Sequence, residues 1–221
     1  KILNYKGRKI GRPLTKQKKE ILNEVLKKNS IYLGHRDFDK FFSPSLPPLN
    51  LEIGSGSGEF IVNQALVNPE KRFIAVEPYI NGLATLASKI HSLNIKNITI
   101  FPDDALKLIN SLPANIFENI FVLFPDPWPK LRHHKRRIIQ KETLNIFSKL
   151  LINNGYFWFA SDHKEYCRFT LLLFQNNKSF YWTALNSEDW QKKPLSWVDT
   201  RYEIKARKRG IAPVFLNFIK T

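Results

Sequence analysis

The chain has 221 residues, of which 43% are hydrophobic and 13% aromatic, so it can fold around one substantial core instead of remaining disordered. Its longest apolar runs, such as residues 120–124 and 156–160, are too short to span a bilayer, and no secretory signal is visible at its start. One cysteine, Cys167, excludes an internal disulfide framework and a cysteine-based zinc site. These features predict a cytoplasmic protein with no membrane partner and no metal.

The net charge of +16 is concentrated in three short segments. Residues 1–28 contain ten Lys or Arg and two Glu, residues 130–137 contain five Lys or Arg and no acid, and residues 201–209 contain five Lys or Arg and one Glu. The remainder of the chain is therefore close to neutral. Charge that served solubility alone would be spread over the surface. Clustering of this kind favours a polyanion as the partner, and a nucleic acid is the natural one.

The first part of the chain, residues 1–48, is expected to form a basic arm. After Thr15, one stripe of a short amphipathic helix is formed by Ile21, Leu22, Val25 and Leu26, and lysines occupy its other face. Residues 41–50, FFSPSLPPLN, are typical of a connector because of their prolines and serines. A folded domain is expected to follow, over residues 49–221.

Beyond the connector, strand-like and helix-like stretches alternate. Strands are expected at residues 49–53, 72–76, 98–101, 119–124 and 156–160, with two more at 181–185 and 213–219. Apolar residues at helical spacing lie between them, for example from Ile80 to His91 and from Ile139 to Leu150. Because the strands are apolar, this alternation predicts an α/β fold, in which a mostly parallel sheet has helices on both faces and binds its ligands at the carboxyl ends of the strands.

The first expected strand runs into a glycine loop, LEIGSGSGEF. Here Glu52 is followed, at spacings of two residues, by Gly54, Gly56 and Gly58. Glycines permit a sharp turn and close approach of the backbone to a ligand. The spacing is one residue shorter than the dinucleotide fingerprint, and Glu59 stands where a phosphate-binding loop would have lysine. An acid beside the loop repels phosphates and suits a cationic ligand.

The next two strands each deliver an acid to the same edge. Glu77, in AVEPY, follows the second strand, where a carboxylate can accept hydrogen bonds from both ribose hydroxyls of a nucleoside. Asp104, in PDDAL, follows the third strand and either lies near an adenine edge or caps a helix, and the residues favour neither reading. Acids around a glycine loop without a phosphate cradle fit S-adenosylmethionine, which has a nucleoside, a sulfonium cation and an amino group but no phosphate.

After the fourth strand, NIFVLFPDPWPK places Asp126 among three prolines. An ordinary turn needs neither three prolines nor a tryptophan. A rigidly held carboxylate can accept hydrogen bonds from guanine N1–H and its exocyclic amine, and Trp128 either stacks on the base or packs in the core. The basic run KLRHHKRR follows at once, and its cations can pair with backbone phosphates.

FPDPWPK followed by RHHKRR resembles the signature of the tRNA (guanine-N7-)-methyltransferase family. EIGSGSGEF, AVEP, PDDA, an ASD ending at Asp162, and TRYE occur in the family's order, so the resemblance spans roughly residues 49–205. It implies a class I methyltransferase fold, a Rossmann-like three-layer sandwich. It also implies methyl transfer from S-adenosylmethionine, with S-adenosylhomocysteine as product, to N7 of the guanine at position 46 in the tRNA variable loop.

The resemblance assigns roles to individual residues of this chain. The family's cofactor-binding positions fall on Glu52, Glu77, Asp104 and Asp126, and Asp126 is also the candidate catalytic residue. The substrate-contact positions fall on Lys130, Asp162, Thr200, Arg201, Tyr202 and Glu203. The RNA-binding stretch falls on Arg132, His133, His134, Lys135, Arg136 and Arg137. Ser55 and Ser57 occupy positions that vary within the family.

Other interpretations stay open at this point. Methyltransferases that act on an exocyclic amine of adenine or cytosine commonly carry N/D-P-P-Y/F at this strand end, where this chain has Pro-Asp-Pro-Trp. A non-enzymatic RNA-binding module would bind no S-adenosylmethionine. A nicotinamide oxidoreductase is disfavoured by the glycine spacing and the basic segments, and a serine hydrolase by the lack of a G-x-S-x-G motif. The sequence is compatible with a monomer or a homodimer.

Overall fold

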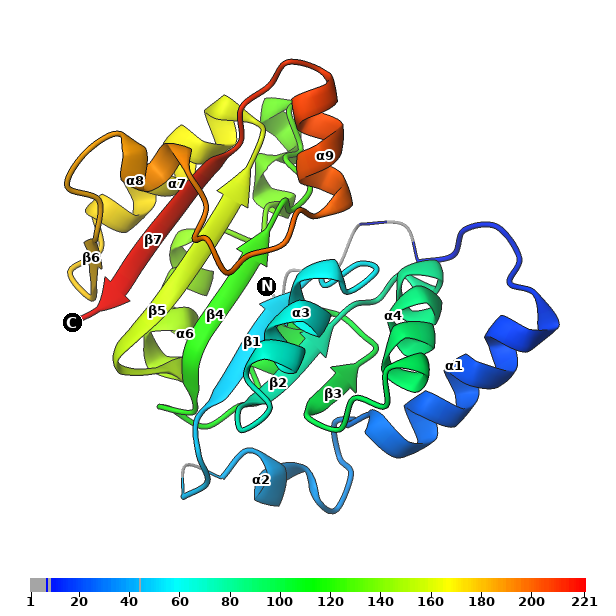
Figure 1. Ribbon diagram of the computed structural model, residues 1–221. Coiled ribbons are helices and arrows are strands. Elements are labelled where there is room, and N and C mark those ends of the chain that lie inside the picture. Colours follow the sequence, from blue (N-terminus) through cyan, green and yellow to red (C-terminus); the bar gives the residue numbers. More distant parts are fainter. Residues whose placement is uncertain (1–6, 8, 44) are drawn as a thin grey trace.

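The computed structural model describes residues 7, 9–43 and 45–221. A seven-stranded sheet in the order β3-β2-β1-β4-β5-β7-β6 runs through the molecule (Figure 1). Its strands are β1 (Leu49–Ile53), β2 (Arg72–Val76), β3 (Ile98–Phe101), β4 (Phe117–Leu123), β5 (Leu151–Ser161), β6 (Phe180–Trp182) and β7 (Val214–Lys220). The first five pair in parallel, and β7 is antiparallel to both β5 and β6. The predicted α/β fold with a mostly parallel sheet is confirmed.

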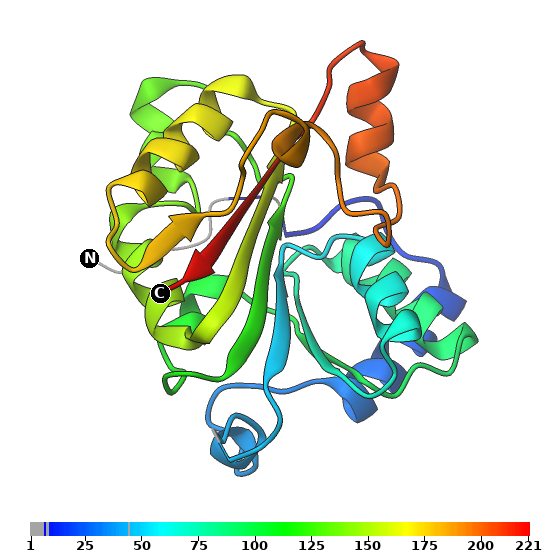
Figure 2. The same ribbon diagram turned by 60° about the vertical axis from the view of Figure 1, so that its left-hand side comes forward.

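Helices cover both faces of this sheet (Figure 2). The helices of the described residues are α1 (Lys16–Asn29), α2 (Phe38–Phe41), α3 (Glu59–Val67), α4 (Ile80–Ser92), α5 (Ala105–Ile109), the 3₁₀ helix η1 (Leu131–Arg136), α6 (Lys141–Leu150), α7 (Lys164–Gln175), α8 (Glu188–Gln191) and α9 (Arg201–Lys208). In β2, Phe73 and Ala75 pack into a cluster with α1, α3 and α4, whereas Ile74 and Val76 pack into a cluster with α5, α6 and α7. This alternation follows from the two-residue period of a strand.

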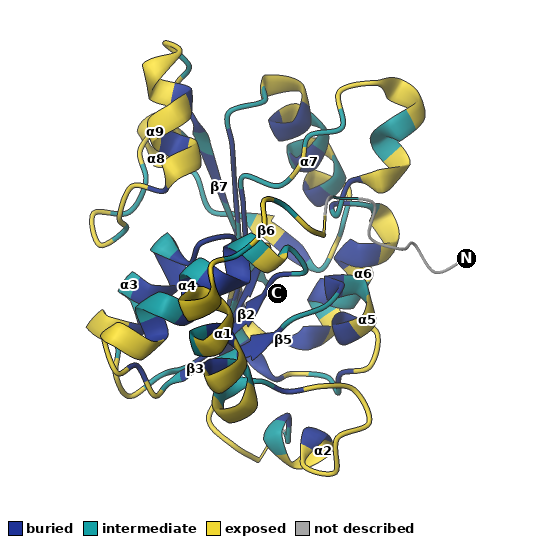
Figure 3. Cartoon of the chain, turned by 90° about the vertical axis from the view of Figure 1, so that its right-hand side faces the viewer, coloured by how far each residue is buried: buried dark blue, intermediate teal, exposed yellow. Residues whose placement is uncertain are grey.

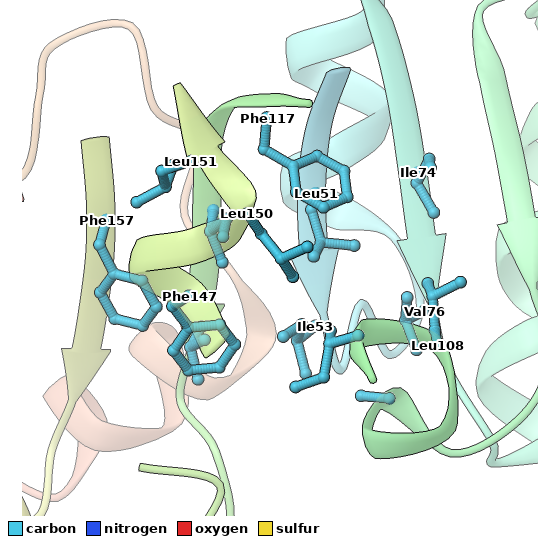
Figure 4. Packing of buried hydrophobic residues seen from close by; sticks show 14 of the residues in the cluster. Leu51, Ile53, Ile74, Val76, Leu108, Phe117, Phe147, Leu150, Leu151 and Phe157 are labelled. Atoms are coloured by element: carbon cyan, nitrogen blue, oxygen red, sulfur yellow. The ribbon is translucent and has the colours of Figure 1, made fainter. Parts of the chain in front are cut away.

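The central strands are buried on both sides, which is why most of their residues are apolar. Every residue of β1 is buried. Figure 4 shows Leu51 and Ile53 of this strand in the larger cluster, together with Phe117, Phe147 and Phe157 from the neighbouring elements. At about 25 cal/mol per Å² of buried apolar surface, clusters of this kind supply the main favourable contribution to folding. They fix the strand ends at which the site is built.

The bounds of the first three strands agree with those expected from the sequence, but β5 begins earlier than expected. Asn153 and Asn154 are exposed, and Asn154 has a left-handed backbone with φ of 61°. The pairing of β4 with β5 also shifts register between Phe117 and Asn119. Polar residues at an irregular strand start break the apolar pattern, so the sequence marks only the regular part of β5.

The N-terminal segment lies against α4. Leu22 and Val25 of α1 are buried in the α4 cluster, and the opposite side of α1 is exposed (Figure 3). Ahead of α1, the backbone N–H of Gly11 donates to Asn81 Oδ1 at 2.8 Å, and Asn81 Nδ2 donates to the carbonyl oxygen of Arg12 at 2.8 Å. The division into a basic arm and a catalytic domain stays a prediction.

Within the described ranges, no helix has the length and apolar character needed to cross a bilayer. The same residues include no group of three or more His, Cys, Asp or Glu side chains that could hold a metal ion. Cys167 packs in the larger core cluster, and its burial raises the pKa of the thiol to about 12. A thiol with this pKa stays protonated at neutral pH, as expected of a packing residue.

Candidate functional site

A pocket of about 570 Å³ opens at the carboxyl ends of β1, β2 and β4. Its walls come from the glycine loop, the loops that follow β2 and β3, the segment after β4, η1 and the start of α9. Of the residues singled out in the sequence, it is lined by Gly54, Gly56, Glu77, Asp104, Asp126, Trp128, Lys135, Arg136, Arg137, Arg201 and Tyr202. Parallel strands bring their ends to one edge, so residues far apart in the chain meet there.

The three loop glycines adopt backbone conformations that suit glycine. Gly54, Gly56 and Gly58 have φ values of 77°, 55° and 73°. A Cβ on Gly54 would meet no atom within 4 Å, so open space lies beside its backbone. Gly58 is the N-cap of α3, and a Cβ there would lie 2.4 Å from Leu86 Cδ1 of α4. Gly58 therefore allows the loop to pack closely against α4, and it does not line the pocket.

A fourth glycine, Gly82, supports the loop and was not singled out in the sequence. It lies in α4, and a Cβ at this position would lie 2.7 Å from the carbonyl oxygen of Gly56. The helix can therefore press directly against the loop backbone. A glycine inside a helix usually lowers the stability of the helix. Its presence within an otherwise helical pattern is therefore the sequence signal for a close contact between the helix and a neighbouring backbone.

Glu77 joins the loop to the pocket. Its Oε2 accepts a hydrogen bond from the Gly56 N–H at 2.6 Å, and its Oε1 accepts one from the Tyr79 N–H at 2.8 Å. Burial raises the pKa of this carboxyl, and the two backbone donors partly offset the increase. Each carboxylate oxygen has two lone pairs, so Glu77 can hold the loop and still accept hydrogen bonds from a ligand.

Glu52 lies directly behind the loop, at 4% exposure, and does not line the pocket. Burial raises the pKa of its carboxyl well above the ordinary value, and the nearby Glu59 and Glu77 raise it further. Among the described residues, its Oε2 and the buried Ser55 Oγ have no hydrogen-bond partner. Buried polar atoms are normally paired, so these two are exceptions, and both residues stand outside the pocket lining.

Of the two roles expected for Asp104, the structure shows that of a helix cap. Its Oδ1 accepts a hydrogen bond from the Leu106 N–H at 2.9 Å and caps α5. The residue is buried and also lines the pocket. A contact with an adenine edge is compatible with this position and stays a prediction.

The segment from Phe124 to Trp128 forms one wall of the pocket. Phe124 and Trp128 have left-handed backbones, with φ of 51° and 45°, on either side of Pro125-Asp126-Pro127. Such conformations are uncommon for residues with side chains and are found where the surroundings impose them. The prolines and these two turns together fix where Asp126 points.

Asp126 lies open to the pocket. Within the described part of the chain, its carboxylate makes no hydrogen bond or ion pair. Its surface is accessible, but the protein atoms on its other side raise the pKa of the carboxyl through desolvation. A carboxylate without an internal partner is available for the N–H groups or the positive charge of a ligand.

The basic run forms η1 beside this wall. Lys130, the N-cap of η1, is exposed, as are Arg132, Lys135 and Arg136 within the helix. The guanidinium of Arg136 lies 4.9 Å from the Trp128 ring, and the His133 ring meets that ring edge-on at 5.8 Å. Trp128 belongs to none of the three buried clusters, so it connects the pocket with the basic surface instead of filling the core.

His133 and Arg137 differ from the exposed cations around them. Desolvation lowers the pKa of His133, and four cationic neighbours lower it further. Arg137 is buried at 1% exposure and donates to the Pro127 carbonyl oxygen at 2.8 Å. Its predicted contact with RNA stays a prediction, but this burial sets it apart from the rest of the stretch.

The TRYE segment divides into two pairs. Arg201 and Tyr202 line the pocket, and the Tyr202 ring stacks near that of Phe124 with a centroid distance of 6.4 Å. Thr200 Oγ1 accepts from the Glu203 N–H at 3.2 Å and caps α9. Glu203 is 1% exposed and pairs with Arg207 at 2.6 Å and with Lys193 at 3.1 Å. The second pair therefore holds α9, which stands beyond the sheet edge (Figure 2).

Besides Thr200 and Glu203, the predicted substrate residues Lys130 and Asp162 lie outside the pocket lining. Asp162, after β5, forms an ion pair with Arg209, the residue that follows α9. Lys130 is exposed at the start of the basic run. Their substrate contacts stay predictions.

Comparisons with known proteins identify the family of this chain. Residues 47–215 match the model of a family described as "Putative methyltransferase". Relatives from Chelativorans sp. (strain BNC1) and Rhizobium johnstonii, both named tRNA (guanine-N(7)-)-methyltransferase, are 36% and 38% identical over 217 residues. These alignments cover 97% of this chain and 94% and 93% of the relatives. A relative of the same name from Rhodospirillum rubrum is 38% identical, over 97% of this chain and 86% of its own.

Solved structures share the fold at low sequence identity. The 16S rRNA methyltransferase KamB has a TM-score of 0.59 at 12% identity, and the aminoglycoside resistance methyltransferase NpmB1 has one of 0.58 at 16% identity. Each alignment covers 86% of this chain and 95% of the other. At this identity the likeness establishes the class I methyltransferase fold alone. With the matching family model and the near full-length relatives, it follows that the chain belongs to the tRNA (guanine-N(7)-)-methyltransferase family.

Proposed function

We propose that the protein transfers the methyl group of S-adenosylmethionine to N7 of the guanine at position 46 in the variable loop of tRNA. The observation that carries the proposal is the composition of one pocket. Its lining combines the glycine loop, Glu77 and Asp104, which suit a nucleoside, with Asp126 and exposed cations of η1, which suit an RNA base and its phosphates. Family membership supports the same reaction.

The pocket suits a cationic nucleoside as the methyl donor. Glu77 would accept the ribose hydroxyls, Asp104 would lie near the adenine edge, and the open space beside Gly54 admits close approach of the ligand to the backbone. When bound, S-adenosylmethionine supplies a methyl group on a sulfonium ion, which the in-plane lone pair of guanine N7 can attack directly. The carboxylates around the pocket attract such a cation.

The residues of the chain then act by orientation and electrostatics. Guanine N7 has no proton at neutral pH, so no general base has to remove one. Asp126 would hold the guanine edge and stabilise the positive charge that the purine gains, because it lines the pocket and its carboxylate has no partner among the described residues. Trp128 would offer a face for the base, and the exposed cations of η1 would pair with phosphates.

Labelled methyl transfer to a tRNA transcript, followed by chain cleavage specific for 7-methylguanosine, tests the proposal. Cleavage is expected at position 46, and a transcript with adenosine there should accept no methyl group. Mass spectrometry of the nucleosides separates N7 methylation from methylation of an exocyclic amine. Calorimetry with S-adenosylmethionine separates an enzyme from a module that only binds RNA. Methylation elsewhere, or none despite cofactor binding, contradicts the proposal.

A further inference from the structure

We propose that Arg137 is a positioning residue, which holds the segment carrying Asp126 and Trp128 in its working geometry, and that it does not bind RNA phosphates. The inference deepens the proposed function and rests on it, because the geometry in question is that of the guanine site. Arg137 stands at the end of the run KLRHHKRR, which by its composition looks like a uniform phosphate-binding stretch. Three observations on the structure support the inference.

First, the guanidinium is enclosed. Arg137 belongs to the inner wall of the pocket, but its side chain has no exposed surface, whereas Arg132 and Arg136 are exposed. Its Cζ lies 4.6 Å from the centre of the Tyr166 ring and 5.0 Å from that of the Phe169 ring, both on α7. A phosphate in solution or on a tRNA cannot reach a group enclosed in this way.

Second, the hydrogen bonds of Arg137 connect α7 to the site segment. Its Nε donates to the Pro127 carbonyl oxygen at 2.8 Å. Its two terminal nitrogens donate to the two carboxylate oxygens of Glu165, with Nη1 to Oε1 at 3.2 Å. A planar guanidinium can serve a carboxylate and a carbonyl at the same time in fixed directions, which a single ammonium group cannot. Pro127 directly follows Asp126 and directly precedes Trp128.

Third, the segment cannot hold itself. Pro125, Pro127 and Pro129 have no backbone N–H, so three of five consecutive residues donate no hydrogen bond. Phe124 and Trp128 are in left-handed conformations that cost free energy and persist only where neighbouring groups impose them. At one end, the Phe124 N–H donates to the Ala160 carbonyl oxygen at 2.7 Å. Arg137 provides the corresponding fixed point beyond Asp126.

The decisive measurement compares the effect of Arg137→Lys on turnover with its effect on tRNA binding. This substitution keeps the positive charge but removes the planar guanidinium that donates to Pro127 and Glu165 at the same time. We expect kcat to fall by about 100-fold, since a displacement of about 1 Å at a reacting centre costs that much, while KM for tRNA is unchanged. The salt dependence of tRNA binding should keep its slope. For Arg132→Ala, an exposed phosphate contact, the slope should fall by about one instead. Arg168→Lys, on the exposed side of α7, is the matched control and should behave as the wild type.

Hydrogen exchange on the free protein provides a readout that needs no tRNA. Arg137→Lys should accelerate exchange of the hydrogen-bonded amides near the two ends of the segment, those of Phe124 and His133, and Arg168→Lys should not. Thermal unfolding shows whether each variant is folded. If Arg137→Lys does not fold, Glu165→Gln undergoes the same measurements, because it loosens the guanidinium without removing it, and Glu142→Gln on α6 is its control.

The outcomes are distinct. A salt slope reduced by about one with kcat unchanged makes Arg137 a phosphate ligand and overturns the inference. Unchanged turnover together with unchanged exchange overturns it as well. If the wild-type protein does not methylate guanine N7 in tRNA, the proposed function fails instead, and the exchange measurement still decides whether Arg137 fixes the segment.

Discussion

The two halves of the pocket are built by different means. On the half formed by β1 and β2, contacts of the backbone shape the pocket. Glu77 accepts hydrogen bonds from two backbone N–H groups, and Gly82 allows α4 to pack against the backbone of the glycine loop. On the half formed by the end of β4, η1 and α9, side chains shape the pocket. There Asp126 has no partner among the residues that the structure describes, and Arg136 and Tyr202 are exposed. The first half is preformed for a small ligand, whereas the second offers exposed groups to a large one.

The difference teaches how one fold serves two substrates of unequal size. A small nucleoside binds more tightly to a rigid site, because binding then orders little of the protein and loses little conformational entropy. A polyanion is held by many exposed cations, each of which contributes modestly and is screened by salt. Substitutions in the first half should therefore change cofactor affinity, and those in the second half should change turnover and the response to salt.

The largest effect is expected for Asp126→Asn. Loss of the negative charge beside the alkylated purine should lower turnover by about 100-fold to 1,000-fold, comparable with the removal of one preorganised electrostatic contact. Stability should be little changed, because the carboxylate has no hydrogen bond or ion pair within the described chain. Single-turnover methyl transfer measures it, and Asp39→Asn, an exposed acid far along the chain, is the control. Near wild-type turnover and cofactor binding would remove Asp126 from its central role.

Glu77→Gln should weaken S-adenosylmethionine binding by about 10-fold to 100-fold, because hydrogen bonds to a charged group contribute about 1.5–3 kcal/mol. The pH dependence has a definite sign. Burial raises the pKa of Glu77 in the free protein, and ribose hydroxyls that donate to the carboxylate lower it on binding. Cofactor affinity should therefore decrease as the pH falls through the raised pKa. Calorimetry over a pH series measures this trend, and the same trend in Glu77→Gln would assign it to another group.

Gly82→Ala tests the support behind the glycine loop. Alanine favours a helix over glycine by about 1 kcal/mol, so any loss must come from the contact with the Gly56 carbonyl oxygen. A methyl group in this space should lower the free energy of unfolding by about 1–3 kcal/mol, and it should weaken binding of the cofactor more than binding of tRNA. Denaturant unfolding and calorimetry measure the two effects. Equal losses of cofactor and tRNA affinity would mean that the two halves are not independent.

The smallest effect concerns His133. Desolvation, followed by four cationic neighbours, lowers the pKa of His133 in the free protein, and tRNA phosphates would offset the repulsion from those neighbours and raise the pKa. Binding should then take up protons, so tRNA affinity should increase modestly as the pH falls between about 8 and 5. Filter binding with His133→Asn should give a flatter pH profile, and an unchanged profile would place the titrating group elsewhere.

The sequence predicts local features better than distant ones. The first three strands and the glycine loop were predicted with their bounds, because short apolar runs end at turn residues. Glu77 and Asp126 were placed at one edge because parallel strands end together. Nothing in KLRHHKRR distinguishes the buried Arg137 from its neighbours, since its partner Glu165 lies 28 residues further along. Burial of Glu203 depends in the same way on Lys193, a contact that no local pattern indicates.

The position of β7 has a consequence for how the protein is made. This strand follows all the others in the chain, yet it lies between β5 and β6 in the sheet. Until it emerges from the ribosome, β5 has an open edge, and the buried rings of Phe157 and Phe159 lack part of their cover. Open apolar edges favour pairing with other chains. A stop codon just before Val214 should therefore yield aggregates instead of a slightly shortened enzyme, although every pocket residue would be present.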